Sequence, residues 1–186
     1  MPGARIIIID PQNDFTFREG VYAKRHAGIV QITTAKQKIN TLLALYEREH
    51  FVILRSDYSE NQFGEGVSMC IPGTFGNQID SDLTLDNHYT VFTKTAHSAL
   101  TATRFQDHLK RGGITTLFLC GFLAEYCVRQ TALDALQHGY HVYLVEDCIG
   151  TGDDVQERKQ AMLKELETRG AMITNSESDF TRLPFN

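Results

Sequence analysis

The chain has 186 residues and a formal net charge of -5, and 42% of its residues are hydrophobic. This length suits a single domain over residues 1–186, and the composition is ordinary for a soluble globular protein. No basic run is interleaved with aromatic residues, so we expect no nucleic-acid partner. The apolar run that ends at Asp10 is too short for a membrane span or a secretory signal, so we expect no membrane association.

Short runs of β-branched and aromatic residues alternate with stretches of helical length along the chain. The runs are nearly continuously apolar, which is typical of strands buried on both faces. The predicted strands are Arg5–Asp10, Phe51–Asp57, Tyr89–Lys94, Thr115–Gly121, His141–Asp147 and Ala171–Thr174. The predicted helices are Ile29–Glu49, Thr103–Arg111, Glu125–His138 and Asp153–Arg169. This alternation predicts an α/β fold with a parallel sheet covered by helices on both faces.

Two segments add detail to this pattern. The last helix is expected to begin with the acidic pair Asp153 and Asp154 and to stop at Gly170, as capping and the helix dipole favour. From Tyr58 to His88 the chain is rich in glycine and has no sustained period. A loop of this length in a compact domain is usually functional, so we expect a lid or pocket wall.

The four cysteines show no C-x-x-C and no zinc-finger spacing. Free thiols in the reducing cytoplasm are therefore the expectation. Cys120 and Cys148 lie in apolar runs and are interpreted as small core residues, and Cys70 lies in the glycine-rich loop. Cys127 differs because it comes just after a predicted strand, in the first turn of a predicted helix.

Ligands of open parallel sheets bind beyond the carboxyl ends of the strands, so reactive residues at those ends are candidates for a site. Asp10 closes the first strand, Lys94 closes the third, and Cys127 follows the fourth. Each also has a structural interpretation. Cys127 could be an inert buried thiol, Asp10 could cap the following turn, and Lys94 could be solvated.

Together these three side chains would form a cysteine nucleophile with its partners. A thiol in the first turn of a helix lies near free N–H groups, which favour the thiolate and can stabilise an oxyanion. A carboxylate can take the thiol proton if an ammonium group balances the charge. His97 is the nearest histidine, but a pocket wall suits it better than the role of base.

Several segments of the chain resemble the isochorismatase-like cysteine hydrolases, which include nicotinamidases and N-carbamoylsarcosine amidohydrolase. The run of isoleucines before Asp10, with Pro-Gln-Asn-Asp-Phe after it, is similar to the opening motif of the family. Lys94-Thr-Ala-His-Ser-Ala is similar to its lysine motif, and Gly121 through Val128 is similar to its nucleophile motif. The resemblance spans nearly the whole chain, with the three motifs in the family's order.

The resemblance implies a three-layer α/β/α, Rossmann-like fold with six parallel strands in the order 3-2-1-4-5-6. It implies a catalytic triad of Asp10, Lys94 and Cys127, a cis peptide between Phe122 and Leu123, and an oxyanion hole made by the backbone N–H groups of Leu123 and Cys127. Relatives form several kinds of oligomer, so a homo-oligomer is expected. We also expect three side chains near the triad to line the substrate pocket, namely Phe15, Phe17 and His97.

One departure from the family concerns metal binding. Nicotinamidases of the family carry Asp-x-His after the second strand and a further histidine in the loop, and these hold a metal ion. Here the corresponding residues are Asp57, Ser59 and Met69, and serine and methionine do not replace imidazole ligands. We therefore expect no catalytic metal, no cofactor and no nicotinamidase activity.

The expected function is hydrolysis of a C–N bond in a small amide, carbamoyl or ureido substrate through a thioester. Family members that lack the cysteine cleave the vinyl ether of isochorismate, which remains an alternative. Another alternative is a catalytically silent, oligomeric binding domain. A haloacid-dehalogenase-type hydrolase would need an aspartate where Gln12 stands, and neither glycine-rich nucleotide motif occurs.

Overall fold

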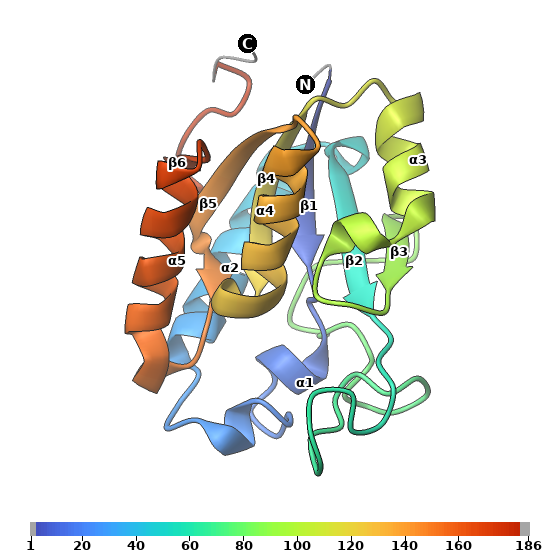
Figure 1. Ribbon diagram of the computed structural model, residues 1–186, viewed down its shortest axis with the longest axis vertical. Helices are drawn as coiled ribbons and strands as arrows, with labels where there is room; N and C mark the ends of the chain where they lie inside the picture. The colour runs from blue at the N-terminus through green and yellow to red at the C-terminus, as the bar shows by residue number, and fades with distance from the viewer. Residues whose placement is uncertain (1–2, 183–186) are drawn as a thin grey trace.

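Six parallel strands form the centre of the molecule (Figure 1), in the order β3-β2-β1-β4-β5-β6. The structure is a computed structural model and describes residues 3–182. The strands are β1 (Ala4–Ile9), β2 (Phe51–Ser56), β3 (Thr90–Lys94), β4 (Thr116–Phe122), β5 (His141–Gly150) and β6 (Met172–Thr174). The predicted parallel sheet and its strand order are confirmed.

The isoleucines of β1 show why these strands are apolar throughout. Side chains alternate between the faces of a strand. Ile6 and Ile8 therefore lie in the core on one face of the sheet, and Ile7 and Ile9 lie in the core on the other. All four are fully buried, which requires helices on both faces.

Those helices complete a three-layer α/β/α architecture. Helix α2 (Val30–Leu45) covers one face, and α3 (Thr103–Arg111), α4 (Arg129–Gln137) and α5 (Gln156–Thr168) cover the other (Figure 1). Within the described part of the chain, no helix is long and apolar enough to cross a membrane.

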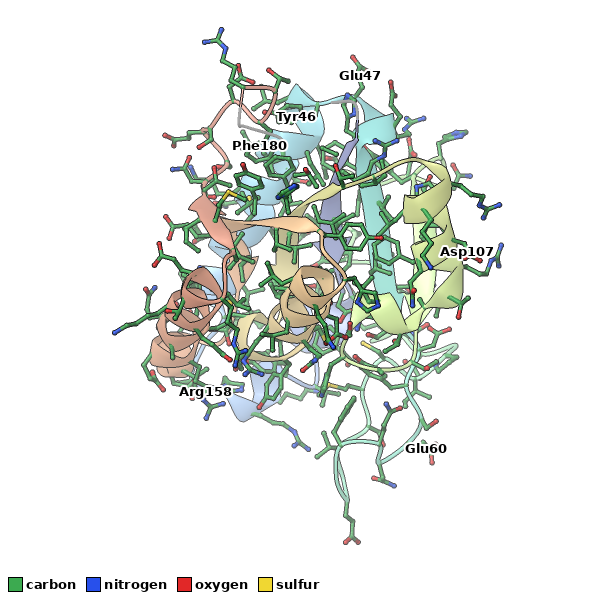
Figure 2. The ribbon with its side chains drawn as sticks, turned by 45° about the horizontal axis from the view of Figure 1, so that its top comes forward. Tyr46, Glu47, Glu60, Asp107, Arg158 and Phe180 are labelled. Carbon is green, nitrogen blue, oxygen red and sulfur yellow. The ribbon has the colours of Figure 1, made fainter. Side chains whose placement is uncertain are left out.

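At the amino-terminal edge of the sheet, Phe180 stacks on Tyr46 with ring centroids 5.3 Å apart (Figure 2).

The boundaries of helices α2 and α5 differ from the sequence-based expectation. Helix α2 ends at Leu45, and a separate 3-10 turn (Arg48–His50) leads into β2. Helix α5 begins at Gln156, and Asp153 lies in a 3-10 turn before it. The Asp153 carboxylate instead accepts hydrogen bonds from two N–H groups of the first turn of α2, each 2.8 Å long. It therefore stabilises the N-terminus of a helix far away in sequence.

The short helix α1 (Asn13–Thr16) and the loop between β2 and β3 gather at the carboxyl ends of the strands (Figure 1). Gln12 ties the loop to the sheet, because its Nε2 donates to the carbonyls of Ser56 and Asn77, each at 2.8 Å. Asn77 Nδ2 in turn donates to the carbonyls of Ser56 and Cys70. This part of the glycine-rich loop is therefore fixed above the strand ends.

Candidate active site

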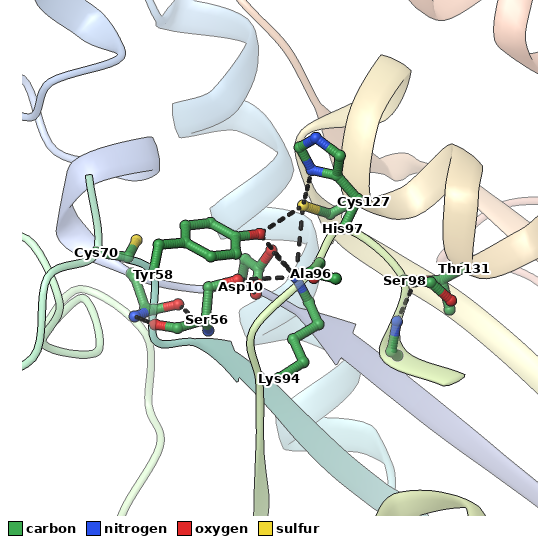
Figure 3. Close-up of polar contacts among 12 residues, drawn as sticks. Asp10, Ser56, Tyr58, Cys70, Lys94, Ala96, His97, Ser98, Cys127 and Thr131 are labelled. Atoms are coloured by element: carbon green, nitrogen blue, oxygen red, sulfur yellow. Dashed lines mark hydrogen bonds and ion pairs between the residues drawn. The ribbon is translucent and has the colours of Figure 1, made fainter. Parts of the chain in front are cut away.

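Asp10, Lys94 and Cys127 meet at the carboxyl ends of the strands, as Figure 3 shows. Asp10 follows β1, and Lys94 ends β3. Cys127 lies in a π-helical turn (Ala124–Val128) after β4, the neighbour of β1 in the sheet. The sequence predicted this cysteine in the first turn of a regular helix. The structure places the π turn before α4, and such turns recur at functional sites.

Asp10 and Lys94 form a buried ion pair. Lys94 Nζ lies 2.8 Å from Asp10 Oδ2, and both side chains are fully buried. Burial alone would lower the pKa of Lys94, but the neighbouring Asp10 and Cys127 more than offset this effect, so its pKa is raised. The lysine is therefore an ammonium group at neutral pH.

Ser56, at the end of β2, bridges the distance between β3 and β1. Its Oγ accepts from Lys94 Nζ at 2.8 Å and donates to Asp10 Oδ1 at 2.9 Å. This residue was missed in the sequence, where the end of the second strand was considered only for metal ligands. The available signal was a hydroxyl at a strand end, paired in register with Lys94.

The Cys127 sulfur contacts three polar atoms. Sγ lies 3.5 Å from Lys94 Nζ, 3.4 Å from Tyr58 Oη and 3.6 Å from His97 Nδ1. Lys94 Nζ also donates to Tyr58 Oη at 3.1 Å. That bond leaves the phenol proton free to point at the sulfur. Sequence reasoning placed Tyr58 only at the start of the expected pocket-wall loop and did not identify its contact with the sulfur.

The resting form of Cys127 differs from the sequence-based expectation. Burial raises the pKa of this thiol to about 12, and the charge of Asp10 acts in the same direction, whereas Lys94 lowers it only in part. The expected thiolate is therefore wrong, and Cys127 is a neutral thiol beside an ion pair at pH 7. The reason is burial, since only 2% of the residue is exposed.

The histidine beside the sulfur is held by aromatic stacking. The His97 ring stacks on Phe63 with centroids 4.6 Å apart and on Tyr126 with centroids 5.7 Å apart. Burial, helped by the charge of Lys94, lowers the pKa of His97, so the ring is neutral at pH 7. A neutral imidazole can donate or accept one hydrogen bond at the sulfur.

The turn before Cys127 depends on a glycine. Gly121 has a φ of +113°, and a Cβ on it would lie 2.1 Å from the Ile9 carbonyl oxygen. Its lack of a side chain lets β4 approach β1 closely where the two strands end. The peptide bond between Phe122 and Leu123 is cis, as the family resemblance implied.

A cavity of about 460 Å³ opens at the sulfur, within the usual range for small-molecule sites. Most of its walls are aromatic or aliphatic, and several come from the loop between β2 and β3. The lining residues are Phe15, Tyr22, Arg25, His26, Tyr58, Phe63, Val67, Met69, His97, Leu123, Tyr126 and Cys127.

The cavity contains two of the three expected pocket residues. Phe15 and His97 line it. Phe17 instead lines a neighbouring hollow and packs edge-on against Phe75, with ring centroids 5.3 Å apart. Phe15 lies within α1 and Phe17 at its end, so a turn of the backbone separates two side chains that are close in sequence.

The residues at the family's metal positions do not fit a metal ion. Asp57 Oδ1 already accepts from Arg55 at 3.2 Å and from Asn77 at 2.8 Å. Ser59 and Met69 offer no imidazole. Across residues 3–182, no three His, Cys, Asp or Glu side chains are grouped so that they could hold a metal.

The family model described as the isochorismatase domain matches residues 4–178 of the chain. A secreted isochorismatase effector of Verticillium dahliae is 28% identical over 148 residues, which cover 80% of this chain and 73% of that protein. A probable inactive nicotinamidase of Arabidopsis thaliana is 27% identical, over 73% of this chain and 74% of that protein. A maleamate amidohydrolase of Pseudomonas putida is 30% identical over 89 residues, 47% of this chain and 41% of that protein.

The fold also matches solved structures. The pyrazinamidase of Pyrococcus horikoshii, in complex with zinc, superposes with a TM-score of 0.79 and is 26% identical. The match covers 94% of this chain and 99% of that one. The arrangement of Asp10, Lys94 and Cys127 is consistent with a catalytic triad.

Proposed function

The chain belongs to the isochorismatase family of hydrolases, and from this premise we propose that it hydrolyses a C–N bond of a small amide, carbamoyl or ureido substrate. The reaction passes through a thioester on Cys127. The observation that carries the proposal is the position of Lys94 Nζ, which touches both Asp10 Oδ2 and Cys127 Sγ. One cation thus links a proton acceptor to a nucleophile.

In the first half of the reaction, the sulfur attacks the substrate carbonyl as Asp10 takes the thiol proton. Because the resting thiol has a pKa of about 12, proton removal accompanies the formation of the C–S bond. Lys94 stabilises the growing negative charge on the sulfur. The oxyanion accepts from the backbone N–H groups of Leu123 and Cys127, at the start of a helix where such groups lack partners within the helix.

The tetrahedral intermediate then collapses. The C–N bond breaks, and the departing nitrogen takes the proton from Asp10. In the second half, Asp10 removes a proton from water, the hydroxide attacks the thioester, and the C–S bond breaks. The thiol regains its proton, and the products are an acid and ammonia or an amine. No step passes through a metal ion, in line with the donor set around Asp57.

The test is a screen of small amides and ureas for ammonia release, with and without EDTA. The wild-type protein should release ammonia from at least one compound at a rate that EDTA does not change. Cys127→Ala should abolish turnover and keep the fold. Cys148→Ala, which removes a thiol buried away from the cavity, should stay active. Activity that persists in Cys127→Ala would refute the mechanism.

Two other functions remain outcomes of this test. Release of pyruvate from isochorismate without ammonia release from any amide would favour vinyl-ether hydrolysis. If the screen finds no turnover and Cys127 reacts no faster with iodoacetamide than the other three thiols, a silent binding domain is favoured. The other three are fully buried, whereas Cys127 borders the cavity. Faster alkylation of Cys127 is therefore the expected result.

A further inference from the structure

The cavity beside Cys127 carries one positive charge that the triad does not use. Arg25 belongs to a 3-10 turn (Ala23–Arg25) and lines the cavity. Its guanidinium has no carboxylate partner within residues 3–182, and its only hydrogen bond, 2.8 Å long, goes to the Gly66 carbonyl of the loop between β2 and β3. Several of its N–H donors therefore remain available to a ligand.

Two other basic side chains at or near the cavity already have carboxylate partners. Lys94 is paired with Asp10 at 2.8 Å, and His26 Nδ1 lies 2.9 Å from an oxygen of Asp154. Among the described residues that line the cavity, none is an aspartate or a glutamate. Glu60, on the same loop as Gly66, points away from the body of the molecule (Figure 2). Arg25 is therefore the one charged side chain on the described cavity wall that has no carboxylate partner among residues 3–182.

The shape and chemistry of the walls favour a flat, apolar group. The rings of Phe63, His97 and Tyr126 form a stack, with interplanar angles of 20° and 27° between neighbours. Phe15 and Leu123 add apolar surface. A flat, conjugated acyl group packs against aromatic rings by offset or edge-to-face contacts, which a bulky saturated ring does not make.

We propose that the substrate is an amide whose flat, conjugated acyl group bears a second carboxylate, and that Arg25 binds this carboxylate while the amide carbonyl meets Cys127. The inference rests on the proposed function and narrows its substrate class. Arginine suits the task because its planar fork matches a carboxylate with two parallel hydrogen bonds. Hydrolysis then yields a dicarboxylate and ammonia, and Arg25 contacts one carboxylate of the product as it did that of the substrate.

The test separates binding from turnover by using the Cys127→Ala protein. Calorimetric titration compares benzamide with 3- and 4-carbamoylbenzoate and with 3- and 4-(aminomethyl)benzamide. At least one carbamoylbenzoate should bind about 10- to 100-fold more tightly than benzamide, as expected for hydrogen bonds between charged partners. The saturated analogue 4-carbamoylcyclohexanecarboxylate should bind more weakly than that carbamoylbenzoate.

Variants in the same protein identify the residue responsible. Arg25→Gln should remove the preference for the carboxylate, and Arg25→Lys should keep part of it. Arg25→Glu should reverse it toward the aminomethyl compounds, a result that loss of the contact to Gly66 would not produce. Lys24→Gln removes the same charge from the neighbouring position, which does not line the cavity, and should leave the preference unchanged.

The outcomes distinguish the two proposals. If no carbamoylbenzoate binds more tightly than benzamide, or if the preference survives in Arg25→Gln, the substrate assignment is overturned. If the preference depends on Arg25 but the wild-type protein releases no ammonia from the preferred compound, the binding assignment stands and the proposed hydrolysis fails. If the wild-type protein hydrolyses benzamide and carbamoylbenzoates equally well, the hydrolysis stands and the substrate assignment falls.

Discussion

The buried pair of Asp10 and Lys94 offers a quantitative test of the site. Lys94→Met removes the cation and leaves a fully buried carboxylate, and Asp10→Asn leaves a fully buried ammonium. Each single change should lower the free energy of unfolding by about 3–5 kcal/mol, the usual effect of leaving one partner of a buried ion pair uncompensated.

The double variant should be much less destabilised than the sum of the two. Five acceptor atoms lie within hydrogen-bond distance of Lys94 Nζ, which has three N–H donors, and its charge matters chiefly to Asp10 Oδ2 and Cys127 Sγ. With both charges removed, the methionine fills the space of the lysine stem, and the new amide can still accept from Ser56. We expect a coupling energy of about 3 kcal/mol between the two positions.

Urea unfolding at pH 7, followed by circular dichroism, measures the three variants and the wild type. In a separate thermal unfolding experiment, the midpoint of each single variant should fall by about 2–4 °C for every kcal/mol lost from the free energy of unfolding. Lys38→Met, at a partly exposed pair with Glu177, is the matched control and should change stability little. All three variants at the buried pair should be inactive. Additive losses in the double variant would refute the interpretation that these two charges compensate each other.

Three further results are expected. The rate of Cys127 alkylation by iodoacetamide should rise about tenfold per pH unit from pH 7 to pH 10, because only the thiolate reacts and the pKa of the thiol is about 12. A plateau of the rate below pH 9 would contradict this pKa. Ser56→Ala should lower stability by about 1–3 kcal/mol and reduce kcat, because two buried charged groups each lose a hydrogen bond; unchanged urea unfolding would show that the bridge is dispensable. Gly121→Ala should lower the free energy of unfolding by about 1–3 kcal/mol or more, since the φ of this position is strained for alanine and the new Cβ meets the Ile9 carbonyl. A thermal midpoint equal to that of the wild type would count against this steric argument.

Much of the fold could be predicted because its signals are local. The isoleucines before Asp10 show in sequence that β1 is buried on both faces, and alternating strands and helices require parallel connections. The three reactive residues could be predicted for a related reason. Asp10, Lys94 and Cys127 lie at or just after the carboxyl ends of strands, which meet at one edge of a parallel sheet.

The partners of these residues were harder to predict, because they depend on register between strands. Ser56 is opposite Lys94 only in the assembled sheet, and Tyr58 reaches the sulfur from the loop that follows β2. Asp153 was expected to stabilise its own helix, but it caps α2. Nothing in the neighbouring sequence distinguishes these two uses of an aspartate.

The amino-acid sequence by itself determined the parallel sheet, its burial on both faces and the reactive groups at its edge, since each follows from residue type and periodicity. Only the tertiary structure decided that the resting Cys127 is a neutral thiol, that Phe15 but not Phe17 faces the cavity, and that Arg25 is its unpaired cation. Protonation and pocket chemistry depend on solvent access and on charges brought together from distant parts of the chain, and these arise only when the chain has packed.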